Sequence, residues 1–431
     1  MDIRILNAFI NDEHIGILTD TNGIWSFEYT SAWINKGYAL SPALPLQKDA
    51  QIDKSTIRPV QNFFDNLLPE EAARKLMANE AGVDVADRFA LLAYYGAETA
   101  GAITLLKEAQ HPAIADAYAE LTYESLSARI RALPQSPLTK ESPKRMSLAG
   151  AQHKLAVCFD HETQALSEPK GATASTHVLK PDHNDIDNYP HSSINEWFVM
   201  RLADIAGLSV PATHYLHVPE TVYLIDRFDR DTTTDKAARK HILDGCQMLQ
   251  LPPESKYRNC TIENLVKLSN MCVEPAATRQ KVFNWLIFNF LVGNSDAHLK
   301  NLSFFINANG YSLTPHYDLL NTTGYGSTSQ KWMHANMVTK LGDVQVFEGV
   351  TIKTLIATGQ EMKVGSVKNI TQRISTLCNK VSTGAQNLYE TLEKTNSDKP
   401  DHLKLTPGEL QHLRKIIYGP LSEAARQLQS S

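Results

Sequence analysis

A dense cluster of polar and ionisable side chains follows an almost wholly apolar run in the second half of the sequence. The cluster consists of Asn294, Ser295, Asp296, His298, Lys300 and Asn301. Asp296 and Asn301 are related as D-x-x-x-x-N, the spacing of phosphoryl-transfer loops in which the Asp accepts the proton of a substrate hydroxyl and the Asn binds magnesium. A turn capped by its own Asp and Asn side chains would show the same short pattern, so other segments must decide.

The apolar run before the cluster predicts the element that positions it. Residues 282–292 contain two polar side chains, Asn284 and Asn289, which is typical of a helix buried on nearly every side. Gly293 then supplies the residue at which helices commonly end. A rigid helix that carries a polar loop is a common way to mount a functional site.

The composition is that of a globular protein. The chain has 431 residues, 42% of them apolar, which is enough for two or three domains with substantial cores. Forty-two basic residues against 47 acidic ones leave a net charge of −5, which argues against a general nucleic-acid binder.

The cysteines and the apolar runs predict a soluble, cytoplasmic protein. The five cysteines are odd in number and form no C-x-x-C pair, so we expect reduced thiols rather than a disulfide framework or a zinc site. The start of the chain shows no secretion signal. The longest apolar run has about 11 residues, against roughly 20 needed to cross a bilayer, so no membrane partner is expected.

The first 133 residues predict a small α+β domain. Residues 3–17 and 24–29 alternate between apolar and polar side chains and are separated by turn residues, which predicts an antiparallel sheet. Within residues 62–77, Pro69 and the acidic pair Glu70 and Glu71 stand where the N-terminus of a helix would have them. Residues 134–144 are rich in proline and polar side chains, so we expect a linker there.

A segment of small residues follows the linker and precedes a predicted strand at residues 155–159. It runs from Ser147 to Ala151, and such a loop lets backbone N–H groups approach a phosphate. A simple tight turn before a strand would show the same pattern. A second predicted strand ends in Lys180, which could neutralise a nucleotide phosphate or could be an ordinary surface lysine.

Residues 191–207 predict a helix that ends at Gly207. Ser193 is the predicted N-cap, and Glu196 three residues later would complete a capping box. Glu196 could instead pair with Lys180, as the helix glutamate of kinases does with its lysine. The sequence alone leaves both interpretations open.

Two further segments place polar residues at predicted strand ends. Residues 221–230 form a β-rich run whose backbone groups, together with Phe228, would meet an adenine, although a plain strand with charged ends fits the same residues. An Asn-Gly pair predicts a hairpin turn before Asp318. Asp318 would then bring a second carboxylate to the metal of Asn301. The remaining chain is predicted to be mostly helical.

The order of these parts is that of a kinase, and the chain resembles a known family. That family is the HipA-like serine/threonine kinase toxins of bacterial toxin–antitoxin systems. The motifs that carry the resemblance are SLAGAQHK at residues 147–154, HVLKP at 177–181, IDRFDR at 225–230, GNSDAHLKN at 293–301 and HYDLLN at 316–321. NFFDNLLPE at residues 62–70 resembles the first domain of the family, so the resemblance spans nearly the whole chain.

The resemblance implies an α+β, bilobal protein-kinase-like fold with a small N-terminal β-rich domain and a mostly helical C-terminal lobe. We therefore expect an N-terminal subdomain at residues 1–133 and the linker at 134–144. The nucleotide-binding part of the kinase core would take residues 145–230, and the helical catalytic lobe residues 231–431.

The same resemblance implies roles for individual residues. Asp296 matches the catalytic base, and His298 and Lys300 match loop residues near the transferred phosphate. Asn301 and Asp318 match ligands of Mg²⁺. The residues that match the ATP site are Ala149, Gly150, Ala151, Gln152, Lys154, Lys180, Asp226, Arg227, Phe228 and Asp318.

Ser147 matches the autophosphorylated serine of the family, whose modification is associated with ejection of the phosphate loop and self-inactivation. A phosphoserine adds about −1.5 to −2 charges, which would repel the phosphates of ATP from this loop. The resemblance further implies ATP and Mg²⁺ as cofactors and a HipB-like DNA-binding antitoxin as partner, with DNA contacted only through that complex. The implied substrate is glutamyl-tRNA synthetase or another translation protein, and the implied outcome is growth arrest and persistence.

Two other classes of protein stay open. A non-catalytic nucleotide-binding corepressor would act through the antitoxin. A metal hydrolase would use Asp296, His298, His316 and Asp318, although the two histidines lack a zinc-type spacing. The absence of G-x-G-x-x-G and D-F-G motifs puts regulation of the eukaryotic kinase type in doubt.

Overall fold

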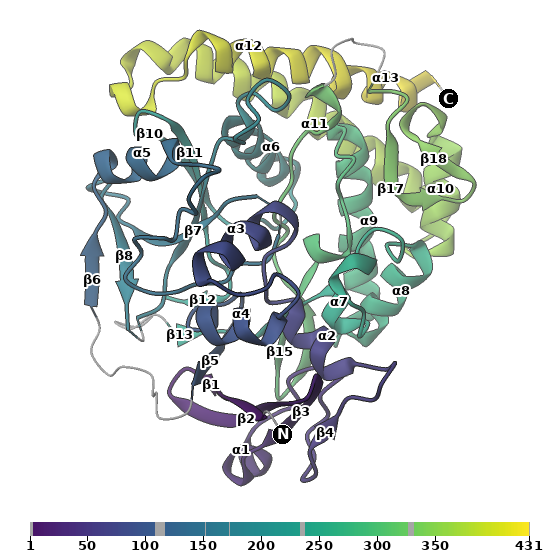
Figure 1. The fold of residues 1–431 in the computed structure, drawn as a ribbon. Coiled ribbons are helices and arrows are strands. Elements are labelled where there is room, and N and C mark those ends of the chain that lie inside the picture. The colour runs from purple at the N-terminus through teal and green to yellow at the C-terminus, as the bar shows by residue number, and fades with distance from the viewer. Residues whose placement is uncertain are drawn as a thin grey trace. The chain divides into compact units, whose positions relative to one another are not determined.

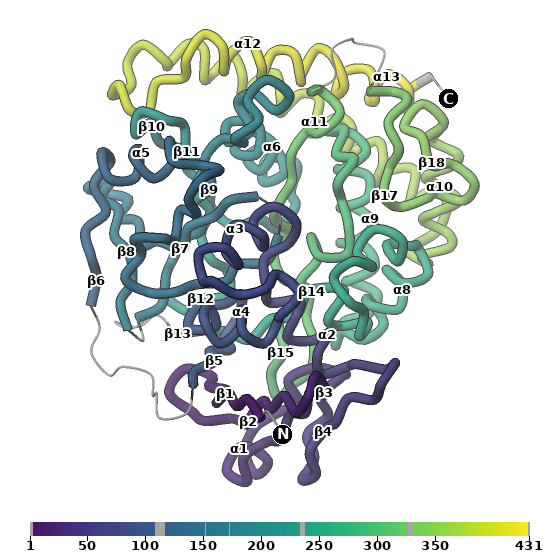
Figure 2. The backbone as a smooth tube through the Cα atoms, in the orientation of Figure 1, coloured from purple at the N-terminus to yellow at the C-terminus, as the bar shows by residue number. Residues whose placement is uncertain are grey.

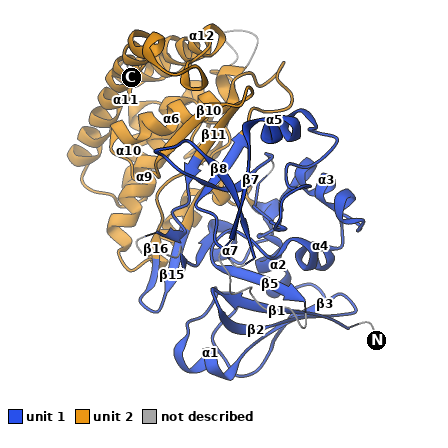
Figure 3. Ribbon diagram, turned by 90° about the vertical axis from the view of Figure 1, so that its left-hand side faces the viewer, with its two compact units in different colours: residues 1–180, 225–255, 304–311 blue, residues 181–224, 256–303, 312–431 orange. Residues whose placement is uncertain are grey.

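Two compact units make up the chain. The computed structural model describes residues 3–107, 117–150, 152–171, 173–232, 238–325 and 332–430. The first unit is formed by residues 1–180, 225–255 and 304–311, and the second by residues 181–224, 256–303 and 312–431 (Figure 3). Most strands belong to the first unit and most long helices to the second, so the predicted α+β class is confirmed (Figure 1).

A five-stranded antiparallel sheet opens the first unit, in the order β4-β3-β2-β1-β5. Its strands are β1 (Ile3–Ile10), β2 (Glu13–Thr21), β3 (Ile24–Tyr29), β4 (Gln51–Ile52) and β5 (Ile103–Lys107). Four helices accompany it: α1 (Ser31–Lys36), α2 (Pro59–Asp65), α3 (Glu71–Ala81) and α4 (Arg88–Tyr95). Trp25 of β3 meets Phe89 of α4 with ring centroids 5.3 Å apart, so aromatic side chains join sheet and helix. The predicted N-terminal sheet is confirmed.

The helix start predicted at Pro69, Glu70 and Glu71 is confirmed, because α3 begins at Glu71 with Glu70 as its N-cap. The structure has two helices there, α2 and α3, because Pro69 lacks the backbone N–H that a continuing helix needs. Leu67 and Leu68 lie in the bend between the two helices and are buried.

A second group of strands in the first unit is hydrogen-bonded in the order β9-β7-β8-β6. They are β6 (Ala117–Glu120), β7 (Leu155–Phe159), β8 (Leu166–Lys170) and β9 (His177–Pro181), and helix α5 (Tyr123–Arg131) follows β6. The smaller elements are β12 (Arg230–Asp231), β13 (Ala238–Arg239), β14 (Ile242–Asp244), α7 (Gly245–Met248), β15 (Ser303–Asn307) and β16 (Gly310–Leu313). Strands β15 and β16 form the predicted hairpin.

The segment predicted as a linker packs into the first unit. Leu138, Thr139, Ser142 and Lys144 are all buried. Residues 134–144 therefore do not form an exposed connection, despite their prolines.

Long helices dominate the second unit. It contains α6 (Ser192–Ala206), β10 (Thr213–His217), most of β11 (Thr221–Asp226), α8 (Ile262–Met271), α9 (Pro275–Val292), β17 (Asn336–Leu341), β18 (Val344–Val346), α10 (Ile352–Glu361), α11 (Val367–Thr395), α12 (Pro407–Ile416) and α13 (Ser422–Ser430). The path of the chain brings α11 back against α6, α9 and α10 (Figure 2). Residues 282–292 of α9 are buried except for the half-buried Asn284, so the predicted buried helix is confirmed.

The predicted capping box of α6 was wrong. The helix begins at Ser192 after His191, and Ser193 lies inside it. The Asp182 carboxylate accepts a hydrogen bond from Ser193 N at 2.7 Å, so a side chain ten residues before the helix satisfies one of its first N–H groups. Glu196 is buried in this helix without the capping role, and its pairing with Lys180 stays a prediction.

All five cysteines are free thiols, as the sequence predicted. Among the described residues, no helix is both long enough and apolar enough to span a membrane.

Buried histidines make acid pH unfavourable for this fold. Burial lowers the pKa of His241, of His316 and of His412 to about 4 in each case. The unfolded value is about 6.5, so each histidine stays neutral in the folded state and binds a proton more readily when unfolded. Stability from these groups is fully present above about pH 6.5 and is lost as the pH falls towards 4. At 1.36 kcal/mol per pKa unit, the loss is roughly 3 kcal/mol per histidine.

We expect the free energy of unfolding in urea to fall steeply between pH 7 and pH 4.5. His241→Gln cannot gain a proton, yet its amide can still donate to the Leu40 carbonyl, which lies 2.9 Å from His241 Nε2. Its stability should therefore depend less on pH over this interval than that of the unchanged chain. If the free energy of unfolding changed equally with pH in both proteins, burial would not lower the pKa of His241.

Candidate active site

The polar loop of the second unit begins at a position that only glycine fills easily. Gly293 ends α9 with φ +66°, the left-handed conformation. A Cβ atom there would lie 2.3 Å from Thr323 Oγ1. Asn294 Nδ2 donates to Asn289 Oδ1 at 2.8 Å, which ties the first loop residue back to the buried helix. The helix and its stop therefore hold the start of the loop in place.

Asp296 lies exposed on this loop, and one neighbour contacts its backbone while another contacts its carboxylate. Its backbone N–H donates to Asn294 Oδ1 at 3.0 Å. The Tyr257 hydroxyl donates to Asp296 Oδ1 at 2.9 Å. Sequence reasoning did not find Tyr257, because nothing in its local pattern marks a residue 39 positions away as a partner of Asp296.

Asn301 and Asp318 come together, as the sequence predicted. Asn301 Nδ2 donates to Asp318 Oδ2 at 2.6 Å, and Asn301 Oδ1 accepts from His298 N at 2.9 Å. Asp318 has φ +59°, a conformation that is uncommon for residues other than glycine and is often found at functional sites.

His298 and Lys300 are buried in the same loop. The His298 ring packs edge-on against Tyr257, with ring centroids 5.1 Å apart. The Tyr317 hydroxyl donates to the Lys300 carbonyl oxygen at 2.7 Å. These contacts make the loop rigid around Asp296.

The residues of this unit fit a magnesium ion. Mg²⁺ prefers oxygen ligands and is usually held by one or two protein groups, with water and phosphate oxygens completing its octahedron. The Asp318 carboxylate and the Asn301 carbonyl oxygen are such groups. A carbonyl oxygen has two lone pairs, so the bond from His298 N leaves one lone pair of Asn301 Oδ1 for a ligand.

The loop that precedes β7 belongs to the first unit and lies along the bend between α2 and α3. Ser147 is fully buried, and its Oγ donates to the Leu67 carbonyl oxygen at 2.7 Å. Its backbone N–H donates to the Glu98 carbonyl oxygen at 2.7 Å. Further along the loop, Glu70 N donates to the Gly150 carbonyl oxygen at 3.2 Å.

Gly150 has φ +109°, so this loop also depends on a glycine. The Lys154 ammonium donates to the Ala149 carbonyl oxygen at 2.6 Å, which places a positive charge directly on the loop. Gln152 lies beside the loop in the lining of a small pocket that also includes Lys154. Ala151 lies outside the described residues.

Lys180, Asp226 and Phe228 lie at or beyond strand ends in the first unit. Lys180 is 5% exposed, so its ammonium is withdrawn from water. Asp226 is the last residue of β11. The Phe228 ring packs edge-on against Phe305, with centroids 6.1 Å apart.

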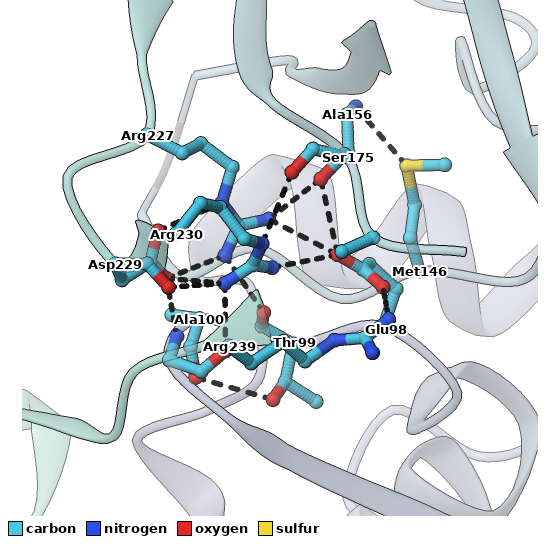
Figure 4. A network of polar contacts seen from close by, with 12 residues as sticks. Glu98, Thr99, Ala100, Met146, Ala156, Ser175, Arg227, Asp229, Arg230 and Arg239 are labelled. Atoms are coloured by element: carbon cyan, nitrogen blue, oxygen red, sulfur yellow. Dashed lines mark hydrogen bonds and ion pairs between the residues drawn. The ribbon is translucent and has the colours of Figure 1, made fainter. Parts of the chain in front are cut away.

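The Arg227 side chain lies in a structural environment, while the role of this residue at the nucleotide stays a prediction. Its guanidinium is buried, with Nε and Nη2 bonded to the Asp229 carboxylate at 2.9 and 2.6 Å (Figure 4). Its Nη1 donates to Ser175 Oγ at 3.0 Å. All three guanidinium nitrogens are thus engaged by protein groups, and we exclude this side chain from the proposed nucleotide contacts.

Glu98 is at the centre of the network around Arg227 (Figure 4). Its carboxylate lies 2.7 Å from a nitrogen of each of Lys144, Arg230 and Arg239, and 3.3 Å from Arg227 Nη1. Burial alone would raise the pKa of Glu98, but these cations hold it well below its usual range. The backbone carbonyl oxygen of Glu98 accepts the Ser147 N–H, so one buried glutamate anchors both the loop before β7 and the IDRFDR segment. Sequence reasoning missed it because its four cationic partners are distant in sequence.

The residues of the alternative metal hydrolase do not gather. Within the described ranges, the ligand atoms of Asp296, His298, His316 and Asp318 form no cluster that could hold a metal ion. Burial also lowers the pKa of His316 to about 4.

Comparison with known proteins identifies the family. Residues 6–106 match the model of the HipA N-terminal domain, and residues 146–386 match that of the HipA-like C-terminal domain. The chain belongs to the HipA family. The HipA-like motifs of the sequence therefore reflect membership of this family.

Two relatives extend this finding along the chain. The serine/threonine-protein kinase toxin HipA of Shewanella oneidensis is 32% identical over 352 residues, which cover 76% of this chain and 77% of its own. A Sinorhizobium fredii protein, named only as a candidate kinase, is 36% identical over 346 residues, which cover 77% of this chain and 80% of its own.

A solved structure of a HipA protein has the same fold. The toxin–antitoxin complex of Shewanella oneidensis HipA and HipB with operator DNA contains a chain that superimposes with a TM-score of 0.79. The alignment covers 98% of this chain and 97% of that chain at 24% identity, so it supports the HipA fold.

Proposed function

We propose that this chain is an ATP- and Mg²⁺-dependent protein kinase that phosphorylates serine or threonine. The observation that carries the proposal is the arrangement of the second unit, where Asp296 lies on a rigid loop and Asn301 bonds to Asp318 at 2.6 Å. A proton acceptor next to an amide–carboxylate pair is what phosphoryl transfer requires of the protein.

In the proposed reaction, Asp296 accepts the proton of a substrate hydroxyl as the hydroxyl oxygen bonds to the γ-phosphorus. The bond from that phosphorus to the ADP oxygen breaks, and the proton remains on Asp296. Tyr257 orients the carboxylate through its hydrogen bond to Oδ1. Mg²⁺ bound by Asn301 and Asp318 would neutralise charge on the triphosphate.

On the nucleotide side, we assign the phosphates to the loop of Ala149, Gly150, Ala151 and Gln152. The ammonium groups of Lys154 and Lys180 would neutralise them. The adenine would meet the backbone of Asp226 and the ring of Phe228.

We further propose that the chain is the toxin of a toxin–antitoxin module, with a HipB-like DNA-binding antitoxin as partner. Its membership of the HipA family supports this role, as does the HipB-bound state of the Shewanella oneidensis protein. Its protein substrate would be glutamyl-tRNA synthetase or another translation protein, and its activity would arrest growth and favour persistence.

Incubation with radiolabelled ATP and Mg²⁺, with and without the antitoxin, tests the proposal. We expect label on the chain itself and on glutamyl-tRNA synthetase in the absence of the antitoxin, and less label in its presence. Nucleotide binding without any transfer would instead identify a corepressor. Transfer to a different translation protein would retain the kinase and reject the synthetase.

Ser147 is the predicted site of autophosphorylation. Its Oγ is buried and donates to the Leu67 carbonyl oxygen, so the loop must leave this position before the hydroxyl can receive a phosphate. A phosphoserine could not return, because it has lost the donor hydrogen and would set about −1.5 to −2 charges against a carbonyl oxygen. We expect Ser147→Ala to reduce self-labelling to background while transfer to a protein substrate continues.

Mass spectrometry of the labelled chain provides the measurement. Ser55→Ala changes an exposed serine of the same unit and should leave self-labelling intact. Full self-labelling of the Ser147→Ala protein would place the modification on another residue.

A further inference from the structure

Two histidines and an aspartate meet at one end of the β7–β9 strand pair in the first unit. His161 follows β7, His177 begins β9, and Asp226 ends β11. Each residue offers one ligand atom, and these atoms all lie within 4.8 Å of one another. His177 Nε2 is 3.0 Å from Asp226 Oδ1. None of the proposed kinase steps uses the two histidines.

The strand pairing brings the two imidazoles together. Val157 of β7 is paired with His177 of β9. Because side chains alternate along a strand, Phe159 lies on the same face as Val157, and His161 follows two residues later in the turn after β7. Phe159 packs edge-on against both rings, with centroids 5.1 Å from His161 and 5.6 Å from His177. The two imidazole centroids are 5.3 Å apart.

A backbone hydrogen bond next to His177 holds the Asp226 carboxylate near the two imidazoles. Arg227 N donates to the Thr176 carbonyl oxygen at 2.8 Å, so the residues next to Asp226 and His177 are hydrogen-bonded to each other. Thr176 Oγ1 lies 2.7 Å from His177 Nδ1. A metal-binding imidazole usually has its second nitrogen held by such a hydrogen-bonding partner. This contact orients Nε2 towards Asp226 and His161.

We propose that His161, His177 and Asp226 bind a divalent transition metal, with Zn²⁺ as the expected ion. Two imidazoles and a carboxylate suit Zn²⁺ and its first-row neighbours, and three protein ligands leave a coordination position for water or a further group. Metal bonds of about 2.0–2.2 Å place tetrahedral ligand atoms about 3.3 Å apart. His177 Nε2 and Asp226 Oδ1, at 3.0 Å, are already close to that separation. His161 lies exposed in a turn, where a small rotation of its side chain would close the site.

Co²⁺ binding to the tag-free full-length chain tests the site, because Co²⁺ replaces Zn²⁺ and reports its ligands by visible absorption. We expect one Co²⁺ per chain with the spectrum of a tetrahedral or five-coordinate site, displaced by one equivalent of Zn²⁺. His161→Ala should weaken binding by about 100-fold or more, because even second-shell changes weaken metal binding by 10–100-fold. Because His161 is exposed, His161→Ala should not disturb folding. Asp226→Asn should also weaken Co²⁺ binding.

Two control variants distinguish this site from nonspecific binding of Co²⁺ at the surface. His14→Ala removes another exposed histidine of the first unit, and Glu162→Gln removes the charge next to His161 without removing a proposed ligand. Both should bind Co²⁺ as the unchanged chain does. Binding that is the same in His161→Ala, or a chain that binds no Co²⁺ at micromolar concentrations, would overturn the proposal. The readout involves no ATP, so its failure would leave the proposed kinase activity untouched.

Discussion

We expect Asp296→Asn to lose phosphoryl transfer while keeping most of its affinity for ATP. The variant retains the shape of the side chain and can still meet Tyr257, but an amide cannot accept the proton of the substrate hydroxyl. General-base catalysis contributes about 10²–10⁴-fold, so transfer should fall by that factor. Because the phosphate contacts come from other residues, nucleotide binding should change little.

Single-turnover transfer of radiolabelled phosphate measures the first quantity, and calorimetric titration with ATP and Mg²⁺ the second. Asp343→Asn is the matched control, since it makes the same change at an exposed carboxylate of the same unit. Near-normal transfer by Asp296→Asn would remove Asp296 from the role of base. A loss of ATP binding equal to the loss of transfer would show a structural role instead.

Glu98→Gln should be among the most destabilising single substitutions in the first unit. The carboxylate is fully buried and pairs with Lys144. It also faces Arg227, Arg230 and Arg239 (Figure 4). After this substitution, Asp229, which pairs with Arg227 and Arg230, would be the remaining carboxylate of this network. Breaking a buried ion pair by removal of one partner costs about 3–5 kcal/mol, because the other charge remains buried without compensation.

Urea unfolding followed by circular dichroism measures this cost. Glu13→Gln breaks an exposed pair of the same unit, with Lys36 at 2.8 Å, and should change the free energy of unfolding by less than about 1 kcal/mol. Similar small effects of both substitutions would mean that water or a rearrangement compensates the cations around Glu98. Proteolysis near Ser147 should also increase in Glu98→Gln if Glu98 anchors that loop.

Local patterns in the sequence predicted several elements closely. The apolar run at residues 282–292 and the glycine after it predicted the end of α9, because burial on all sides and a left-handed stop leave a direct signature. The strand at residues 155–159 was predicted with its exact bounds. The Asn301–Asp318 contact was also predicted, since a short hairpin brings its two ends together.

Other features depended on partners that are distant in sequence. The Ser193 capping box was wrong because Asp182 supplies the acceptor from outside the helix. The fold also surrounds the Arg227 side chain with Asp229, Ser175 and Glu98, partners that its motif did not indicate. Neither outcome could be read from periodicity or spacing.

The sequence by itself determined the family, the order of the functional segments and the buried helix that supports the polar loop. These follow from residue types and short-range spacing, which are properties of the chain before it folds. The tertiary structure alone decided which polar groups meet: Tyr257 with Asp296, Glu98 with its four cations, and His161 with His177 and Asp226. Electrostatic and metal-binding contacts depend on distances of a few ångströms between residues far apart in the chain, and only the folded backbone sets those distances.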